Sequence, residues 1–225
     1  MILNNPKIEI WKNFALIADD THFTPWAKQY GSVIFDKNVR PFEKYIPQGG
    51  VVVDGGANQG MYSSAFCELV GDEGEVHSFE PNELPYVCLC INAPKATRYM
   101  MALGEKDGFC NISECKNYGA CCVKSGEKVA VRPLDFLGLS RCDFIKLDLE
   151  GYELLALRGA IETIQNNKPT LVIEVVDGYM RRFNTTPQEL YDFLVNEYLP
   201  ESRDTIGISD VPNGKEWYEY LARYH

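Results

Sequence analysis

Two acid-containing glycine turns carry the residue types and the spacing that could do chemistry in this chain. Asp54–Gly60, with the sequence Asp-Gly-Gly-Ala-Asn-Gln-Gly, follows three consecutive valines, and Asp148–Gly151 follows the apolar run Phe-Ile-Lys-Leu. Glycine lets the backbone turn tightly and approach a ligand without a Cβ in the way. A strand, a glycine turn and a helix together present backbone N–H groups and a positive helix end at one point. Each turn therefore predicts a ligand site.

The spacing of the first turn separates one cofactor class from another. A dinucleotide fingerprint needs glycines at n, n+2 and n+5. Counted from Gly55 or from Gly56, the later glycines fall at the wrong positions, so both frames fail. The remaining pattern of Asp54, Gly56 and Gly60 resembles the first motif of S-adenosylmethionine-dependent methyltransferases. An acid in place of the pyrophosphate cradle suits a cofactor that carries a cationic amino acid.

A third acid stands where such a cofactor site would need one. Glu80 ends a strand-like run and lies 20 positions after Gly60. A carboxylate at this place can accept hydrogen bonds from both ribose hydroxyls. Pro81 and Asn82 then turn the chain into a helix whose apolar residues recur at i, i+3, i+4 and i+7. The order of strand, helix, strand and helix is typical of an α/β sheet.

Composition limits the classes of partner. The chain has 225 residues, of which 45% are hydrophobic, which is enough for one sizeable core. Its 22 Lys and Arg against 32 acids give a formal net charge of −10, which argues against tight, sequence-independent binding of nucleic acid. The first residues have no apolar signal-peptide core, and no run reaches the roughly 20 apolar residues of a membrane span. We therefore expect a cytoplasmic protein with no membrane and no nucleic-acid partner.

The cysteines are expected to be reduced and free of metal. The chain has eight, and four of them fall within residues 110–122. No Cys-x-x-Cys pair is present, and the adjacent Cys121 and Cys122 would point to opposite faces of a strand. Core thiols and a sulfur-rich hairpin explain this segment better than structural zinc, so the sequence predicts no metal site.

Around these motifs, apolar periodicity and turn residues predict the elements that must position them. Helices are expected at 61–70, ended by Gly71, over about 154–164, from a capping box at Thr186 to about 199, and from Gly214 onward. Further strands are expected at 97–103, 143–147 and 170–176, with one or two antiparallel excursions over 109–133 and short strands within 200–211. The fold class is α/β and Rossmann-like, a mostly parallel sheet with helices on both faces.

Five ordered motifs make a resemblance specific. Asp-x-Gly-Ala-Asn-x-Gly, Phe-Glu-Pro, Ala-Leu-Gly, Asp-Phe-Ile-Lys-x-Asp-x-Glu-Gly and Lys-Pro-x-x-x-x-Glu occur in this order between about residues 49 and 176. This set is similar to that of the FkbM-type methyltransferase family. The resemblance implies a single methyltransferase domain over 1–225, in which 1–48 is a lid or substrate segment, 49–176 the cofactor core and 177–225 helices and short strands.

The family also implies S-adenosyl-L-methionine as cofactor and methylation of a hydroxyl on a sugar, a glycan or another small molecule. The implied roles place the glycine loop beneath the methionine, Glu80 at the ribose, and the residues after the second and third strands near the adenine. Asp54 would organise the turn, contact the amino group through water or cap the next helix. The cofactor-binding residues implied are Asp54, Gly55, Gly56, Ala57, Asn58, Gly60, Glu80, Pro81, Asn82, Leu103, Gly104 and Asp148.

Three residues are candidates for the chemistry itself. Asp148 and Glu150 follow a strand at the sheet edge where open α/β folds bind ligands, so either could take a proton from an attacking hydroxyl. They could instead stabilise the next helix N-terminus, an effect of about 0.3–1 kcal/mol each. His22 could be a substrate-side base or ligand, or belong to a helix-capping turn. Lys146 and Glu174 lie in apolar strands, where we expect them to pair with each other or with Asp148 for support.

Two other functions stay open from sequence. One is a nicotinamide-dependent oxidoreductase with a Rossmann fold, which the failed glycine frames disfavour. The other is a binding protein that keeps the cofactor loop without chemistry. The methyl acceptor, the oligomeric state and whether a metal assists the reaction do not follow from the residues.

Overall fold

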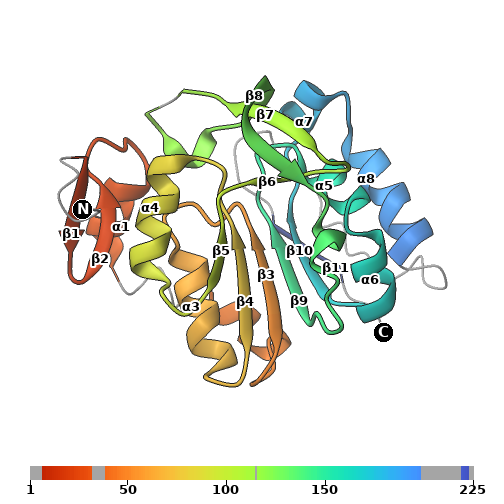
Figure 1. Cartoon of the computed structure of the whole chain (residues 1–225), viewed down its shortest axis with the longest axis horizontal. Coiled ribbons are helices and arrows are strands. Elements are labelled where there is room, and N and C mark those ends of the chain that lie inside the picture. The colour runs from red at the N-terminus through yellow and green to blue at the C-terminus, as the bar shows by residue number, and fades with distance from the viewer. Residues whose placement is uncertain (1–6, 32–38, 115, 199–218, 223–225) are drawn as a thin grey trace.

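A six-stranded sheet forms the centre of the protein (Figure 1). The structure is a computed structural model and describes residues 7–31, 39–114, 116–198 and 219–222. The strand order is β11-β10-β9-β3-β4-β5, in which β11 is antiparallel to β10 and the other pairs are parallel. The strands span Val51–Gly55 (β3), Glu75–Phe79 (β4), Thr97–Tyr99 (β5), Phe144–Leu147 (β9), Thr170–Glu174 (β10) and Glu219–Ala222 (β11).

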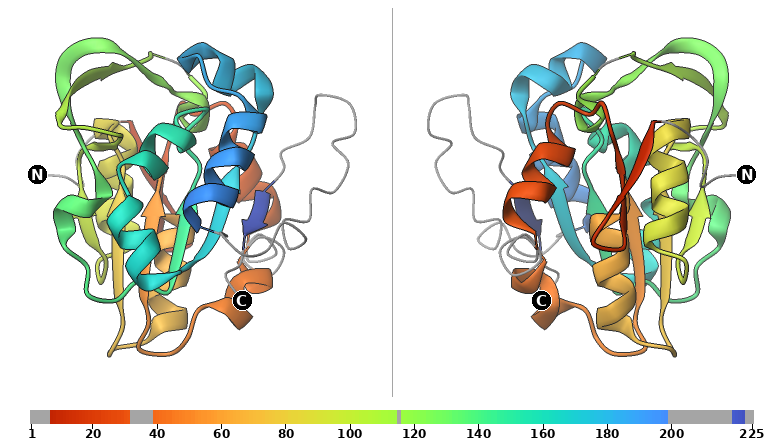
Figure 2. Two further views of the ribbon diagram at one scale, coloured as in Figure 1. Left: turned by 90° about the vertical axis from the view of Figure 1, so that its right-hand side faces the viewer. Right: turned by 90° about the vertical axis from the view of Figure 1, so that its left-hand side faces the viewer.

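Helices cover both faces of this sheet, as the views from either side show (Figure 2). On one face lie α3 (Met61–Val70) and α4 (Glu83–Asn92). On the other lie α5 (Glu153–Arg158), α6 (Ile161–Asn167) and α8 (Pro187–Phe193), which runs on into a π-helix at Leu194–Tyr198. Short helical turns occupy Leu134–Leu137, Asp177–Met180 (α7) and Arg181–Phe183. The predicted α/β class with helices on both faces is confirmed.

Burial on both faces explains why the central strands are apolar almost throughout. All four residues of β9 are buried, Lys146 among them. Phe144 packs toward α3, with its ring centroid 5.5 Å from that of Phe66 and 5.7 Å from that of Phe42. Ile145 points to the opposite face and packs among residues of α5, including Leu154. These two cores fix β9 beside β3, which brings the two turns seen in the sequence to the same edge of the sheet.

The described N-terminal part is a small hairpin followed by a helix. Strands β1 (Ile8–Trp11) and β2 (Phe14–Ile17) pair antiparallel, and α1 (Phe23–Tyr30) follows. The turn at Arg40–Tyr45 then leads into the sheet. Asn92 of α4 holds β2 in place, because its side chain accepts a hydrogen bond from the N–H of Ala15 at 2.6 Å and donates one to the carbonyl oxygen of Ala15 at 2.8 Å.

The predicted third strand is divided between two sheets. Its first part is β5, and its second part, β6 (Ala102–Leu103), leaves the central sheet to pair with β8 (Val123–Arg132). β8 pairs antiparallel with β7 (Gly108–Ile112), so 109–133 forms one hairpin that arches above the sheet (Figure 1). Cys121, between these strands, is disulfide-bonded, which corrects the expectation that all cysteines are reduced.

Two expected helices differ from the structure. The helix over about 154–164 is divided into α5 and α6 around Gly159. Within the described residues 219–222, the helix expected from Gly214 onward is wrong, since they form β11 and pair with β10, and the rest of that helix lies outside the described residues. Its helix-like spacing is overridden because the edge of β10 offers a full ladder of unpaired backbone groups. The strands expected within 200–211 lie outside the described residues.

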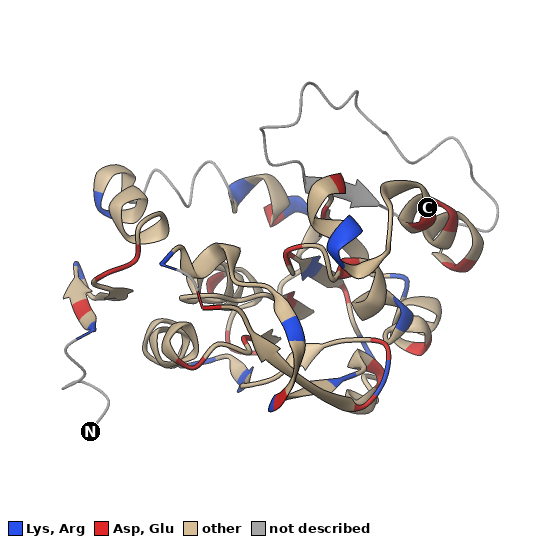
Figure 3. Ribbon diagram, turned by 90° about the horizontal axis from the view of Figure 1, so that it is seen from above, with Lys and Arg blue, Asp and Glu red and all other residues tan. Residues whose placement is uncertain are grey.

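Charged residues are dispersed among the elements of the described chain. Seen from above, Lys and Arg are scattered among the elements and do not gather in a stripe, while several acids lie near its centre (Figure 3). None of the described helices combines the length and the apolar character needed to cross a bilayer.

Candidate active site

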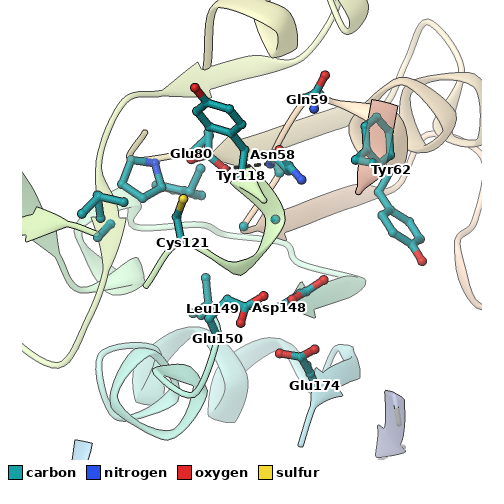
Figure 4. Close-up of a pocket in the computed structure, with 18 of the residues that line it drawn as sticks. Asn58, Gln59, Tyr62, Glu80, Tyr118, Cys121, Asp148, Leu149, Glu150 and Glu174 are labelled. Atoms are coloured by element: carbon teal, nitrogen blue, oxygen red, sulfur yellow. Dashed lines mark hydrogen bonds between the residues drawn. The ribbon is translucent and has the colours of Figure 1, made fainter. Parts of the chain in front are cut away.

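A pocket of about 450 Å³ opens beyond the carboxyl ends of the central strands, where parallel sheets bind ligands. The residues after β3, β4 and β9 line it, together with Glu174, the last residue of β10. The hairpin β7–β8 and the start of α1 form its outer walls. Figure 4 shows the glycine loop and Glu80 on one side and the acids of the second turn opposite them. Both sequence turns therefore belong to one site.

The glycine loop is held against two strands. Gly56 has φ of +74°, and a Cβ built on it would collide with the carbonyl oxygen of Asp148. The N–H groups of Gly56 and Ala57 both donate to the carbonyl oxygen of Phe79, at 3.0 and 2.9 Å. Glycine is therefore required at position 56 because of its backbone conformation and because β9 approaches so closely.

Glu80 is fixed by backbone donors and lies next to the loop. Its Oε2 accepts a hydrogen bond from the N–H of Asn58 at 2.8 Å, and its Oε1 accepts one from the N–H of Asn82 at 2.8 Å. The side chain is buried, and burial raises the pKa of its carboxyl to about 7, while the two N–H donors act in the opposite direction. The carboxylate thus has a defined orientation without any ligand.

Asp54 lies behind the loop and does not line the pocket. It is fully buried, its Oδ2 accepts a hydrogen bond from Oγ of Ser63 at 2.6 Å, and its Oδ1 lies 3.6 Å from Nζ of Lys146. Burial raises the pKa of this carboxyl, and Lys146 opposes the shift. Residue Gly60 occupies the N-cap position of α3, without a side-chain cap. Asp54 therefore links α3 to β9 and is neither the cap of α3 nor within the pocket.

The second turn presents Glu150 in an unusual backbone conformation. Glu150 has φ of +57° and Gly151 has φ of +102°, where a Cβ would collide with the backbone of Tyr179. Oε1 of Glu153 accepts hydrogen bonds from the N–H of Leu149 at 2.7 Å and from the N–H of Gly151 at 3.2 Å. Glu153 thus organises the turn from beneath, and the strained backbone of Glu150 is held in place by these bonds.

Three carboxylates meet at this end of the pocket. One oxygen from each of Asp148, Glu150 and Glu174 lies within 4.8 Å of the other two. Burial, followed by the neighbouring acids, raises the pKa of Glu150 to about 8 and that of Glu174 to about 10. The Asp148 side chain is 39% exposed, and its Oδ2 lies 3.6 Å from Nζ of Lys146. Lys146 thus contacts Asp148, one of its expected partners, and also Asp54.

Aromatic side chains line the outer part of the pocket. Phe23 and Trp26 come from α1, with ring centroids 5.8 Å apart, and Tyr118 comes from the segment between β7 and β8. Buried Asp20 joins these segments, because its carboxylate accepts hydrogen bonds from the N–H groups of Thr24 at 2.7 Å and Tyr118 at 3.3 Å. These aromatic side chains lie on a side of the pocket to which none of the five sequence motifs contributes.

The structure brings most of the sequence candidates to the pocket wall and leaves others behind it. The candidates that line the pocket are His22, Gly56, Ala57, Asn58, Glu80, Pro81, Leu103, Asp148 and Glu150. His22 is exposed there and occupies the N-cap position of α1 without a side-chain cap. The candidates that do not line it are Asp54, Gly55, Gly60, Asn82 and Gly104. Gly104 instead packs on β8, with its Cβ position 2.6 Å from Val131.

Sequence reasoning missed several lining residues. They are Gln59, Tyr62, Met101, Ile112, Tyr118, Val123, Leu149 and Tyr152, and also Lys146 and Glu174, to which the sequence assigned only structural support. Glu174 carried a usable signal, because an acid at the end of a buried strand lies at the ligand-binding edge of a parallel sheet. The hairpin residues carried none, since their approach depends on how the insertion folds over the sheet.

Comparison with known proteins identifies the family. A model of the methyltransferase FkbM domain matches residues 54–204. The chain belongs to the FkbM methyltransferase family. The resemblance seen in the five motifs is thereby confirmed, and S-adenosylmethionine is the cofactor of this FkbM-family chain.

Two solved structures share the fold. The crystal structure of methyltransferase FkbM from Methylobacillus flagellatus KT is 23% identical and has a TM-score of 0.53, with 78% of this chain and 44% of that chain covered. The FkbM-family chain thus spans less than half of the length of that protein. A candidate rRNA-methylase from Clostridium thermocellum is 11% identical, with a TM-score of 0.50, 85% of this chain and 96% of that chain covered. No curated protein matches the sequence.

The residues of this FkbM-family pocket fit the cofactor. The carboxylate of Glu80 is held in a fixed orientation, which suits a pair of ribose hydroxyls, and Oδ1 of Asn58 is buried without a hydrogen-bond partner among the described residues. The apolar side chains of Phe79 and Leu103 lie on the same wall and suit a flat base. Polar groups that converge in a largely apolar cavity are typical of a small-molecule site.

Proposed function

We propose that this chain transfers a methyl group from S-adenosylmethionine to a hydroxyl of a sugar, a glycan or another small molecule. One observation carries the proposal, namely that a cofactor wall with its carboxylate already oriented faces a cluster of acids across a single pocket. A methyl donor on one side and a proton acceptor on the other are the two parts that such a transfer needs.

The cofactor wall would hold the donor through three contacts. Glu80 would accept hydrogen bonds from the ribose hydroxyls, and the backbone from Gly56 to Asn58 would hold the methionine part. Leu103 and Pro81 would contact the adenine. Because Glu80 is already oriented by two N–H donors, little ordering is needed when the cofactor binds.

Asp148 is the residue we assign to proton transfer. S-adenosylmethionine supplies an electrophilic methyl group on a sulfonium, which an acceptor hydroxyl takes by in-line displacement while it releases its proton. Asp148 is the most exposed of the three acids, and Nζ of Lys146 lies 3.6 Å from its Oδ2. Lys146 orients the Asp148 carboxylate, and Glu150 lies beside it at the bottom of the pocket. A base in this position contributes about 10²–10⁴-fold to the rate.

The outer wall is where we place the acceptor. Trp26 and Tyr118 offer flat apolar faces, against which a sugar ring can pack. His22 lies at the same wall with an exposed imidazole and is assigned a hydrogen bond to the acceptor. An acceptor held there lies between the aromatic side chains and the acids.

Two measurements test the function. Isothermal titration with S-adenosylhomocysteine and with NAD should show binding of the former alone, and binding of NAD alone would favour an oxidoreductase. Methyl transfer onto a panel of sugars and glycans should be lost in Asp148→Ala and reduced in Glu150→Ala, while Glu68→Ala on the exposed side of α3 should keep wild-type activity. Cofactor binding without transfer to any acceptor would indicate a non-catalytic binding protein.

A further inference from the structure

The three acids beyond β9 and β10 form an arrangement that the proton transfer leaves largely unused. Asp148 and Glu150 belong to the turn after β9, and Glu174 ends the neighbouring strand β10. In Figure 4 their carboxylates turn toward one another below the glycine loop. One oxygen of each lies within 4.8 Å of the other two. A single base would not require two further acids at this distance.

Two of these carboxylates have an oxygen that nothing described in the protein satisfies. Glu150 and Glu174 are each only 4% exposed. Oε2 of Glu150 and Oε2 of Glu174 have no hydrogen-bond partner among the described residues. A buried polar atom that is left unsatisfied destabilises the folded protein, and more so if it is charged. Both atoms belong to residues that line the pocket.

The protein's own positive charges do not balance this end of the pocket. Lys146 is shared, since its Nζ lies 3.6 Å from Oδ2 of Asp148 and 3.6 Å from Oδ1 of fully buried Asp54. The positive charge of Arg182, which is not one of the three acids' hydrogen-bond partners, lowers the pKa of Glu150 but does not offset the larger effect of burial. Glu153 adds a further buried acid beneath the turn. Among the described residues, five carboxyl groups therefore share two cations at this end of the pocket.

We propose that Asp148, Glu150 and Glu174 bind a divalent metal ion of the Mg²⁺, Mn²⁺ or Ca²⁺ class. Carboxylate oxygens are hard ligands, which these ions prefer. Ligand oxygens about 2.1–2.5 Å from one ion lie up to about 4–5 Å from each other, which agrees with the observed spacing. Three carboxylates leave other coordination positions for water or for oxygens of an acceptor.

The role of the ion rests on the proposed methyl transfer, but the binding of the ion can be tested without it. An ion held here would bind and polarise an acceptor hydroxyl and so do part of the work assigned to Asp148. It would also favour acceptors with two neighbouring hydroxyls, since these can chelate one ion. Ion binding can be measured in the absence of any methyl donor or acceptor, so failure of this proposal and failure of the methyl-transfer proposal are distinguishable.

The probe is Mn²⁺, added to metal-depleted protein and followed by the loss of the electron paramagnetic resonance signal of free Mn²⁺. We expect one site per chain that Mg²⁺ displaces. Glu174→Gln should weaken Mn²⁺ binding at least tenfold. The matched control Glu68→Gln, which changes an exposed acid on α3, should bind Mn²⁺ as the wild type does. Mn²⁺ should also raise the Tm of the wild type and of Glu68→Gln but not that of Glu174→Gln.

Two results would overturn the proposal. One is a free Mn²⁺ signal that wild-type protein leaves unchanged at millimolar ion. The other is unweakened binding in Glu174→Gln. If Glu174→Gln fails to fold, as judged by circular dichroism, Asp148→Asn decides in its place, because that side chain is 39% exposed and its loss leaves the core intact. Unweakened binding in Asp148→Asn would place the ion elsewhere.

Discussion

The two ends of the pocket differ in how their acids are satisfied. At the end that we propose for the cofactor, called the cofactor end below, both oxygens of Glu80 accept hydrogen bonds from backbone N–H groups. At the opposite end, Glu150 and Glu174 each keep a buried oxygen without a hydrogen-bond partner among the described residues. The cofactor end is therefore complete before a ligand arrives, while the acid end requires something from outside. Substitutions at the two ends should accordingly have different effects on binding and on turnover.

The largest effect is expected from Asp148→Asn, which tests the acid end. Loss of the proton acceptor should lower kcat by about 10²–10⁴-fold. Affinity for S-adenosylhomocysteine should change little, because the cofactor end is untouched. Steady-state kinetics and isothermal titration on the same preparation measure both. A fall in cofactor affinity as large as the fall in kcat would contradict the division of the pocket.

Gly56→Ala should disturb the cofactor end by moving its backbone. The added Cβ meets the carbonyl oxygen of Asp148 at a residue with φ of +74°. Left-handed backbone and overpacking together should lower the free energy of unfolding by about 3 kcal/mol. S-adenosylhomocysteine should bind at least tenfold more weakly. Gly108→Ala is the control, because a Cβ there meets nothing within 4 Å. Chemical denaturation measures the stability of both variants, and titration measures their affinity for S-adenosylhomocysteine. If Gly56→Ala and Gly108→Ala give the same values, the glycine loop tolerates a side chain.

Glu80→Gln should remove a charged hydrogen-bond acceptor from the cofactor end. Because hydrogen bonds to a charged group are worth about 1.5–3 kcal/mol, we expect roughly a tenfold or greater loss of affinity for S-adenosylhomocysteine. S-adenosylhomocysteine titrations of both proteins supply the measurement. If Glu80→Gln binds S-adenosylhomocysteine as tightly as the wild type does, Glu80 does not bind the ribose.

The same residue predicts a pH dependence of stability. Burial raises the pKa of the Glu80 carboxyl from 4.5 to about 7. Between these two pH values the folded protein therefore holds a proton on Glu80 that the unfolded chain has released. Stability from this group is present below pH 4.5 and is lost as the pH rises through about 7. The free energy of unfolding of wild type, relative to Glu80→Gln, should therefore fall by about 3 kcal/mol over this range. Urea denaturation at several pH values measures this difference, and a flat difference would be the contrary result.

Trp26→Ala should give the smallest effect and tests the outer wall. Loss of one aromatic face should raise the acceptor KM by roughly three- to tenfold while cofactor affinity stays the same. Initial rates at varied acceptor concentration show the change, with Trp26→Phe as the variant that should retain most of the affinity. An unchanged acceptor KM in Trp26→Ala would place the acceptor elsewhere in the pocket.

Local patterns were enough to predict the centre of the fold. The strands β3 and β4 and the helix α3 could be predicted because their signals depend only on residues close in sequence. These signals are the three valines before the glycine turn, the run that ends at Glu80, and Gly71 after a helical segment. The capping box held for the same reason, since Oγ1 of Thr186 accepts a hydrogen bond from the N–H of Glu189 at 3.2 Å. Such signals do not depend on the rest of the chain.

Contacts between distant segments could not be predicted. The spacing of Trp217, Tyr220 and Leu221 fits a helix, but 219–222 pairs with β10 because that strand had a free edge. Glu174 joins Asp148 because β10 lies beside β9, a neighbourhood that no local motif encodes. The same holds for Asp20, whose partner Tyr118 lies 98 positions away. The acid end of the pocket was therefore only partly visible in the sequence.

The close approach of Gly56 to the carbonyl of Asp148 has a consequence for redesign. The glycine loop and the acid turn touch through backbone atoms, so they act as one rigid part. A chimera that took either segment alone from another family member would bring mismatched main chains together. New acceptor preferences are better sought in α1 and the β7–β8 hairpin, whose side chains reach the pocket from outside this contact. Evolution of acceptor choice could follow the same route, with the paired turns inherited together.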